Sequence, residues 1–372
     1  MQIISIAFCF NNSFCSLAAG AISSLIKHTS EQYKYDIYIV HDDISEQNQF
    51  LIRTLNRKDN VSINFIPIEF KDYTVADLDY ETRLTKYSFA RLFLHKLLPE
   101  IDKILYLDCD IVVTSDISEL FNQNLEGHSI GVCIGQFGQR GVDKLKLVQF
   151  NTKIPGCQNY QSQYDYFSKH LNLTDEQIDS YFNSGVILFD LKKSCNVLNK
   201  KLPELLKQKY IFADQDILNI AFKDDKKIID TKFNVGAWSS YKYFCESSKY
   251  PTIIHYIGHK PTTSMNRPMA YCYWEEISHT NFYYPALEQF INRKEVDLER
   301  RIYNHFNNEK GLSDLYHNLK RFNRKRIKRK FIRTIIKPVV DIKKYKKLKR
   351  DPKRFFADSK SRFIKFLGMF YS

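Results

Sequence analysis

Glycine and proline are scarce in this chain, whose 372 residues include 12 Gly and 10 Pro but 28 Phe and 24 Tyr. Disordered and low-complexity chains have the opposite composition, poor in aromatic residues and rich in small or turn-forming ones. With 44% hydrophobic residues, the sequence is long enough to bury a full core in one large domain and still carry an appendage. The composition therefore predicts a globular protein.

Paired cysteines and long uncharged runs are also missing. The eight cysteines contain no Cys-x-x-Cys pair, which argues against a zinc site or a disulfide framework and predicts free, reduced thiols. No uncharged run is long enough for a transmembrane helix. The apolar start, Met1 to Leu25, lacks a basic first segment and is interrupted at Asn11, so we expect a strand and a helix there instead of a signal peptide.

The net charge of +14 is unevenly distributed along the chain. The tail from Asn318 to Ser372 holds 21 Lys and Arg against three acids, and the remainder holds 35 basic and 39 acidic residues. The mildly acidic body argues against a nucleic-acid-binding core. Large apolar side chains recur among the basic residues of the tail, which favours an amphipathic segment on an anionic membrane surface. An RNA-binding tail and a solvated, disordered tail are the alternatives.

Segments with strand and helix character alternate along the first part of the chain. Residues 3–10, 35–40 and 61–66 are β-rich, and the helical segments 14–28 and 45–56 lie between them. This alternation is typical of an α/β fold with a mostly parallel sheet. Further strands are predicted at 129–134, at 251–257 and within 181–190, where an apolar strand follows an Asn-Ser-Gly turn. Further helices are predicted at 87–98, 117–121, 191–208 and from 213 onward. Residues 135–172 are polar and weakly periodic, which predicts an insertion or lid.

A short apolar run ends in two acids separated by one residue, Asp108-Cys109-Asp110. Its length and β-branched residues favour a buried strand. Positions i and i+2 of an extended segment point the same way, so the two carboxylates can converge. Converging carboxylates repel unless a cation, a proton or a basic side chain compensates, and a hard divalent ion suits oxygen ligands. Taken alone, so short a pattern is better explained by a strand with a polar end, and its context must decide.

Six segments in order resemble glycosyltransferase family 8, whose members are retaining enzymes that use nucleotide sugars and have a GT-A type α/β fold. These segments are Ile3 to Phe14, Ser88 to Leu92, Leu105 to Asp110, Phe182 to Val186, Ala213 to Leu218 and His255 to Pro261. The resemblance is to bacterial galactosyl- and glucosyltransferases that extend lipopolysaccharide or lipooligosaccharide cores. We expect a catalytic domain at 1–280, a helical connection at 281–317 and a basic, helical, membrane-associating tail at 318–372.

The resemblance implies three groups of site residues. Asp108, Asp110 and His255 would bind Mn²⁺, with Mg²⁺ as the alternative ion. Asn11, Arg91, Asp108, Asn183, Ser184 and Lys260 would bind the donor, and Asp214 and Gln215 would lie beside the anomeric carbon. Two departures concern the donor site: the family usually has Asp where Asn11 stands, and the segment from Gly258 to Lys260 is one residue shorter.

Simpler structural roles compete for five of these residues. Arg91 could be a surface arginine, His255 a core histidine and Asp214 a helix N-cap, and Asn183 and Ser184 could form a simple turn. Retention can proceed through a double displacement, for which Asp214 is the better nucleophile, or through front-face attack, which we favour because no unambiguous nucleophile stands out.

The expected protein is a cytoplasmic enzyme, peripheral at the inner face of the cytoplasmic membrane, that transfers glucose or galactose from a UDP-sugar to a saccharide or glycolipid acceptor such as a lipopolysaccharide core. The alternatives are a non-catalytic protein of the same fold that binds nucleic acid through its tail, and a transferase with a protein or wall-polymer acceptor.

Overall fold

The computed structural model describes residues 1–69, 86–150, 152, 154, 156–247, 250–258, 260–263 and 268–292. The described residues belong to one compact unit, Met1–Arg293. The start of the predicted connection is helical at 283–292, whereas the predicted basic tail at 318–372 lies outside the described residues. The boundaries at 280 and 317 stay predictions. Within the described ranges, no helix combines the length and apolar character needed to cross a membrane.

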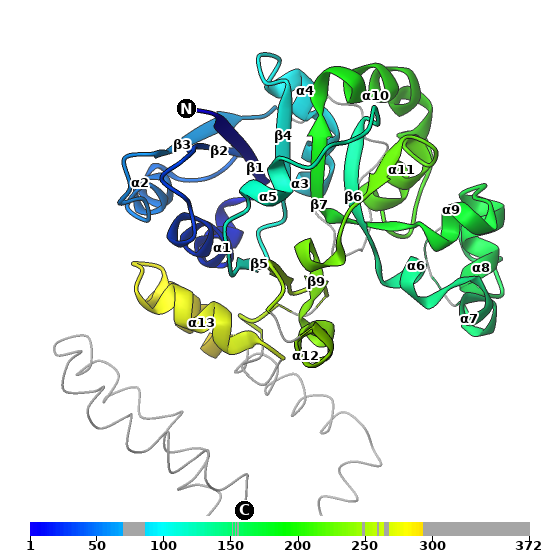
Figure 1. Cartoon of the computed structure of the whole chain (residues 1–372). Coiled ribbons are helices and arrows are strands. Elements are labelled where there is room, and N and C mark those ends of the chain that lie inside the picture. Colours follow the sequence, from blue (N-terminus) through cyan, green and yellow to red (C-terminus); the bar gives the residue numbers. More distant parts are fainter. Residues whose placement is uncertain are drawn as a thin grey trace, which may run out of the picture. The chain divides into compact units, whose positions relative to one another are not determined.

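Seven strands form the central sheet, in the order β3-β2-β1-β4-β7-β6-β8 (Figure 1). They are β1 (Ile3–Cys9), β2 (Lys34–His41), β3 (Val61–Pro67), β4 (Lys103–Leu107), β6 (Ile130–Ile134), β7 (Phe182–Asp190) and β8 (Lys226–Ile228). All run parallel except β7, which pairs antiparallel with β4 and β6. The mostly parallel α/β sheet expected from the sequence is confirmed.

A second, three-stranded sheet has the order β5-β10-β9. It consists of β5 (Ile111–Val113), β9 (Val235–Gly236) and β10 (Ile253–His255), with β10 antiparallel to β5 and parallel to β9. The predicted strand at 251–257 is therefore shorter than expected, because its partners are themselves only two and three residues long. Residues Asp108 to Asp110 connect β4 of the central sheet to β5 of the small one.

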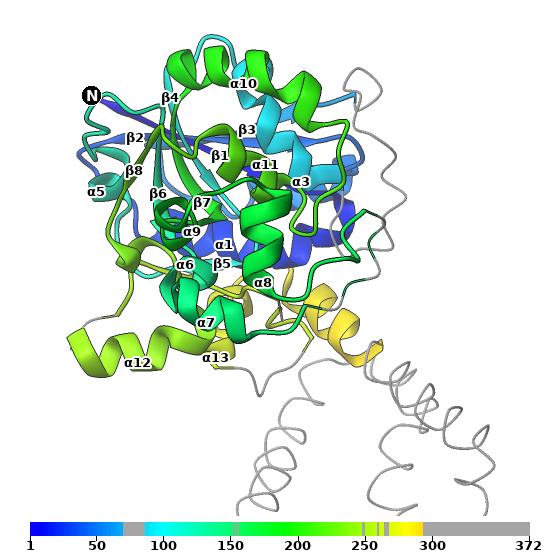
Figure 2. The same cartoon turned by 90° about the vertical axis from the view of Figure 1, so that its right-hand side faces the viewer.

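Helices cover both faces of the central sheet (Figures 1 and 2). The α-helices are α1 (Cys15–Lys27), α2 (Glu46–Arg53), α3 (Lys86–Ala90), α4 (Leu94–Leu97), α5 (Ser118–Phe121), α6 (Gln136–Arg140), α7 (Val142–Leu147), α8 (Gln163–Asp165), α9 (Asp175–Asp179), α10 (Leu191–Leu205), α11 (Asp214–Ala221), α12 (Ala237–Ser247) and α13 (Ala270–Ser278). The 3₁₀ turns are η1 (Asn12–Phe14), η3 (Arg91–Phe93) and η5 (Thr231–Phe233), and η4 (Tyr166–His170) is π-helical.

The alternation of side chains along the buried strands explains the two layers. In β1, Ile4, Ile6 and Phe8 join the core beneath α1 and α13, while Ala7 and Cys9 join the core beneath α10 and α11. Successive residues of a strand point to opposite faces, so a sheet with apolar residues at every position is covered on both sides. The result is a doubly wound arrangement whose strand ends are left to form a site.

Two predicted segments differ in the structure. The helix expected at 87–98 is broken into α3, η3 and α4, and the break carries Arg91, whose Nε donates to the Ser88 carbonyl oxygen at 2.9 Å. A continuous helix would use that carbonyl within its own ladder. The segment 135–172 contains α6, α7, α8 and η4. Its Tyr166 and Phe167 are fully buried and join the core, whereas other residues of the segment, such as Leu147, are exposed.

Candidate active site

The ten residues singled out in the sequence line one pocket, with a volume of about 250 Å³. Three of these residues follow strands of the central sheet: Asn11 comes after β1, and Asp108 and Asp110 come after β4. Asn183 and Ser184 lie at the beginning of β7, and Asp214 and Gln215 lie at the beginning of α11. Arg91 belongs to η3, His255 ends β10, and Lys260 lies in the loop after β10. Because β7 runs antiparallel to β4, its beginning meets the ends of the parallel strands. Ligands of doubly wound folds bind at this edge.

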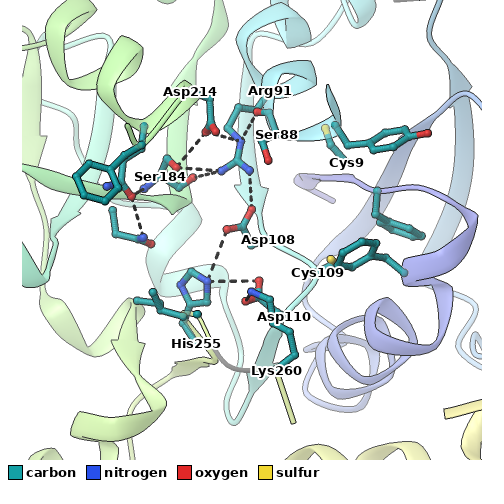
Figure 3. Close-up of a pocket in the computed structure, with 18 of the residues that line it drawn as sticks. Cys9, Ser88, Arg91, Asp108, Cys109, Asp110, Ser184, Asp214, His255 and Lys260 are labelled. Atoms are coloured by element: carbon teal, nitrogen blue, oxygen red, sulfur yellow. Dashed lines mark hydrogen bonds and ion pairs between the residues drawn. The ribbon is translucent and has the colours of Figure 1, made fainter. Parts of the chain in front are cut away.

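Arg91 lies at the centre of the pocket wall (Figure 3). Its Nη2 is 2.9 Å from Asp108 Oδ1, its Nε is 3.2 Å from Asp214 Oδ2, and its Nη1 donates to the Ser184 carbonyl oxygen at 2.7 Å. The guanidinium carbon lies 4.3 Å from the centre of the Tyr106 ring. Burial alone would lower the pKa of Arg91, but the two carboxylates raise it above its ordinary value. Arg91 is thus a buried cation that links two acids, and it is not a surface residue.

Asp108, Asp110 and His255 offer donor atoms that all lie within 4.8 Å of one another. His255 Nε2 is 3.6 Å from Asp108 Oδ2 and 3.4 Å from Asp110 Oδ1. A Cβ at Gly185 would lie 2.3 Å from His255 Cε1 and 2.5 Å from Asp108 Oδ2, so only glycine leaves room for this cluster. The convergence expected of the two carboxylates is present, with an imidazole facing them.

Lys260 forms an ion pair with Asp110 Oδ2. Burial alone would raise the pKa of Asp110, but the Lys260 ammonium and His255 hold it below its ordinary value. Burial alone would likewise lower the pKa of Lys260, and Asp110 keeps it raised. The backbone at Gly258 has φ 81°, a conformation that favours glycine and leads the chain back to the pocket. The cationic side chain expected at the diphosphate therefore lies next to the candidate metal ligands.

Asp214 is the first residue of α11, and Ala213 occupies the N-cap position with φ 45°. A non-glycine residue at positive φ is strained and persists only where its surroundings hold it. Asp214 is 3% exposed and accepts a hydrogen bond from Ser184 Oγ at 3.1 Å, besides its contact with Arg91. Burial raises the pKa of Asp214 to about 6 although Arg91 opposes this, and the Asp108 charge adds to the rise. The N-cap role considered from the sequence is wrong.

Gln215 and Asn183 are joined side by side in the pocket. Gln215 Oε1 accepts from Asn183 Nδ2 at 3.0 Å and from the Ser184 backbone N–H at 3.2 Å. Gln215 Nε2 donates to the Tyr181 hydroxyl at 3.2 Å, and that hydroxyl donates to Asp216 Oδ1 at 2.5 Å. The amide of Gln215 is therefore held in one orientation.

Asn11 lines the same pocket as the aromatic residues Phe10, Phe14 and Tyr87, and Asn11 Oδ1 accepts from Ser13 Oγ at 2.8 Å. The lining of the pocket therefore combines charged groups with aromatic rings. An elongated ligand with an anionic part and a flat part suits such a site.

Four supporting residues were not predicted from the sequence. Tyr106 donates to Asp108 Oδ1 at 2.8 Å, Asn234 bonds His255 Nδ1 at 2.8 Å, and Tyr181 and Asp216 hold Gln215. Asp216 stands inside one of the quoted segments, but an acid in the first turn of a helix is also expected from the helix dipole. Tyr106, Tyr181 and Asn234 carry no local signal, because their role depends on which strands become neighbours.

Comparison with known proteins places this site in context. Residues 5–263, which contain all ten site residues, match the sequence profile of Glycosyl transferase family 8. The chain is 27% identical to glycosyltransferase GlyF of Streptococcus pneumoniae serotype 4 over 71% of this chain and 58% of that protein. It is 24% identical to the lipopolysaccharide 1,2-glucosyltransferase of Escherichia coli K12 over 63% of this chain and 62% of that enzyme. The matched region thus spans about three fifths of the length of these relatives.

Two solved structures share the fold. The WbbM bifunctional glycosyltransferase has a TM-score of 0.66 at 23% identity, over 78% of this chain and 52% of that one. The galactosyltransferase LgtC in complex with donor and acceptor sugar analogs has a TM-score of 0.59 at 21% identity, over 75% of this chain and 96% of that one. The α/β fold seen here is accordingly of the GT-A type.

Proposed function

The chain belongs to glycosyl transferase family 8, and from this premise we propose that it moves glucose or galactose from a UDP-sugar to a saccharide acceptor with retention of anomeric configuration. The activity of a glycosyltransferase follows from the family. The observation that carries the finer proposal is the convergence of Asp108, Asp110 and His255 beside two cations, Arg91 and Lys260. This grouping suits a diphosphate bound through a divalent ion, with the nucleoside against aromatic residues of the pocket lining.

We propose that Asp108, Asp110 and His255 hold Mn²⁺, with Mg²⁺ as the alternative ion. Their donor atoms are close enough to reach one ion, and Gly185 leaves the space between them open. A set of two carboxylates and one imidazole suits manganese, whereas magnesium prefers oxygen ligands and water. When bound, such an ion supplies Lewis-acid stabilisation of the charge on a departing diphosphate.

Lys260 and Arg91 have different parts in the proposal. The Lys260 side chain is 30% exposed and its ammonium pairs with Asp110 Oδ2. The ammonium is therefore placed to bind the diphosphate as a point charge. The N–H groups of Arg91 donate to protein acceptors in Ser88, Ser184, Asp108 and Asp214. We therefore assign Arg91 mainly to the orientation of the two acids, and only its remaining N–H to the donor.

The surroundings of Asp214 and Gln215 support front-face attack. Asp214 is buried and its carboxylate is shared between Arg91 and Ser184, so it is poorly placed to attack a sugar carbon. Gln215 Oε1 already accepts two hydrogen bonds, which occupy both lone pairs of an amide oxygen. Gln215 keeps one free N–H on Nε2. Asp214 and Gln215 would then stabilise and orient the donor sugar, and the leaving phosphate would take the proton of the acceptor.

For the acceptor we propose a lipopolysaccharide or lipooligosaccharide core, supported by the similarity to the lipopolysaccharide glucosyltransferase of Escherichia coli. The basic tail at 318–372 would hold the enzyme at the anionic inner face of the cytoplasmic membrane. Removal of these residues should release the protein from anionic liposomes and leave turnover on a short, water-soluble acceptor unchanged. Equal liposome binding by the full chain and the truncated chain would contradict the proposed membrane role.

A panel of nucleotide sugars with and without Mn²⁺ tests the proposed donor and ion. Hydrolysis or transfer should be measurable with UDP-glucose or UDP-galactose and should depend on the metal. Asp110→Ala should abolish turnover and metal-dependent UDP binding with the fold intact by circular dichroism. Asp102→Ala is the matched control, because Asp102 is exposed at the other end of β4 and forms a surface ion pair with Lys192. Full activity of Asp110→Ala would overturn the metal site.

A further inference from the structure

A row of three side-chain amides leads from His255 along the wall of the pocket. Asn234 Oδ1 is 2.8 Å from His255 Nδ1, and Asn234 Nδ2 donates to Asn183 Oδ1 at 3.0 Å. Asn183 Nδ2 in turn donates to Gln215 Oε1 at 3.0 Å. We call Asn234, Asn183 and Gln215 the amide row. It joins the candidate metal ligand to the first turn of α11.

Two backbone N–H groups fix the direction of every hydrogen bond in the amide row. The Gly185 N–H donates to Asn183 Oδ1 at 3.1 Å, and the Ser184 N–H donates to Gln215 Oε1 at 3.2 Å. A backbone N–H can only donate, so the oxygen of each amide must face it. With Asn183 Oδ1 fixed in this way, Asn234 must present its NH₂ to Asn183 and its oxygen to His255.

The oxygen of Asn234 determines which nitrogen of His255 carries hydrogen. An amide oxygen only accepts, so Nδ1 of the ring must donate to it. A neutral imidazole has a single N–H, which leaves the lone pair on Nε2. That nitrogen faces Asp108 Oδ2 and Asp110 Oδ1 at 3.6 and 3.4 Å. The lone pair therefore points to the place where the three candidate ligands converge.

We infer that Asn234 is a positioning residue that selects the Nδ1–H tautomer of His255 and directs Nε2 toward the metal. The inference rests on the metal site of the proposed function. Asn234 is well placed for this task, because it is 7% exposed and directly precedes β9, whose Gly236 pairs with His255 in β10. Metal-binding histidines commonly donate their other N–H to a protein acceptor, and loss of that partner lowers metal affinity about 10- to 100-fold.

Asn234→Ala tests the inference by metal affinity. Titration with Mn²⁺ alone, followed by calorimetry or by electron paramagnetic resonance, should show an affinity about 10- to 100-fold below that of the wild type. Asn60→Ala is the matched control. Asn60 directly precedes β3 and donates to the carbonyl oxygens of Ser30 and Tyr33, so its replacement removes structural hydrogen bonds that do not involve the pocket. Wild-type Mn²⁺ affinity in Asn234→Ala would overturn the inference.

The tautomer itself can be measured without any metal. Nitrogen-15 spectra of the full chain, assigned by comparison with His255→Gln, should show the ring proton on Nδ1 in the wild type. Asn234→Asp keeps an acceptor at Nδ1 and should retain that tautomer, whereas Asn234→Ala should lose the preference. A wild-type ring without hydrogen on Nδ1 would contradict the inference even if every variant were unstable. If the wild type has the Nδ1–H tautomer and binds no Mn²⁺, positioning by Asn234 stands and the proposed metal site falls.

Discussion

A single methyl group at Gly185 should disable the candidate metal site. The Cβ of an alanine would lie 2.3 Å from His255 Cε1 and 2.5 Å from Asp108 Oδ2, where contacts below 3.0 Å are not tolerated. The His255 ring is 2% exposed, so it can yield only by moving within the core. Relief requires a shift of about 1 Å, and metal sites tolerate deviations of about 0.2 Å in their ligand distances. Gly185→Ala should therefore lose Mn²⁺ binding at least about 100-fold.

The same substitution should cost about 1–3 kcal/mol of unfolding free energy, which is typical of overpacking a core. Calorimetric titration with Mn²⁺ and urea unfolding measure the two effects on one protein sample. Gly236→Ala is the matched control, because Gly236 pairs with His255 in the small sheet but an added Cβ would meet only Ile257, at 3.8 Å. Gly236→Ala should bind Mn²⁺ with wild-type affinity. If Gly185→Ala also did so, the assignment of the cluster as a metal site would be refuted.

Two further predictions concern the buried charges. Arg91→Lys keeps the charge but cannot span Asp108 and Asp214, so urea unfolding should show a loss of about 3 kcal/mol. Arg57→Lys, at an exposed position, should change little, and equal losses in the two variants would contradict the bridging role. Burial raises the pKa of Asp216 from 3.8 to about 6, so the folded state retains a proton that the unfolded state has lost. Wild-type stability should therefore fall by up to roughly 3 kcal/mol between about pH 4 and pH 6 relative to Asp216→Asn, and parallel pH profiles of the two proteins would count against it.

The first half of the fold could be predicted because its signals are local. The strands β1, β2 and β3 have runs of β-branched and aromatic residues, and Ser45, the first residue of the helical segment expected at 45–56, accepts a hydrogen bond from the Asn48 backbone N–H at 3.3 Å. Helix α1 consists mostly of small and apolar residues and is buried at nearly every position, as expected of a helix packed between a sheet and a second helix. Such patterns involve residues only a few positions apart, so they can be recognised from the sequence of a single segment.

Only part of the small sheet could be predicted: β10 lies within the strand expected at 251–257, whereas strands as short as β5 and β9 have no measurable period. The pairing of β10 with β5 joins segments about 140 residues apart, and the pairing of β10 with β9 joins segments about 20 residues apart. The break in the helix at Arg91 is also a long-range effect, since the guanidinium is held by Asp108, Asp214 and Ser184. Tertiary contacts override local propensity in both places.

The ten residues named from the resemblance lie together in the lining of one pocket, and their roles as metal-binding, donor-binding and catalytic residues stay predictions. The resemblance did not indicate that Arg91 would bridge two acids, that Asp214 would be buried, or that Asn234 would hold His255. These roles depend on contacts between side chains that are far apart in the sequence, and no local pattern of residues indicates such contacts.

The central claim is that Asp108, Asp110 and His255 bind one divalent ion that carries the nucleotide diphosphate. Anomalous diffraction at the manganese edge, from crystals of the full chain grown with Mn²⁺ and UDP, tests it most directly. We predict one strong peak within coordination distance of Asp108, Asp110, His255 Nε2 and the diphosphate oxygens. A diphosphate bound without a peak at that point, or a manganese peak elsewhere in the pocket, would contradict the account.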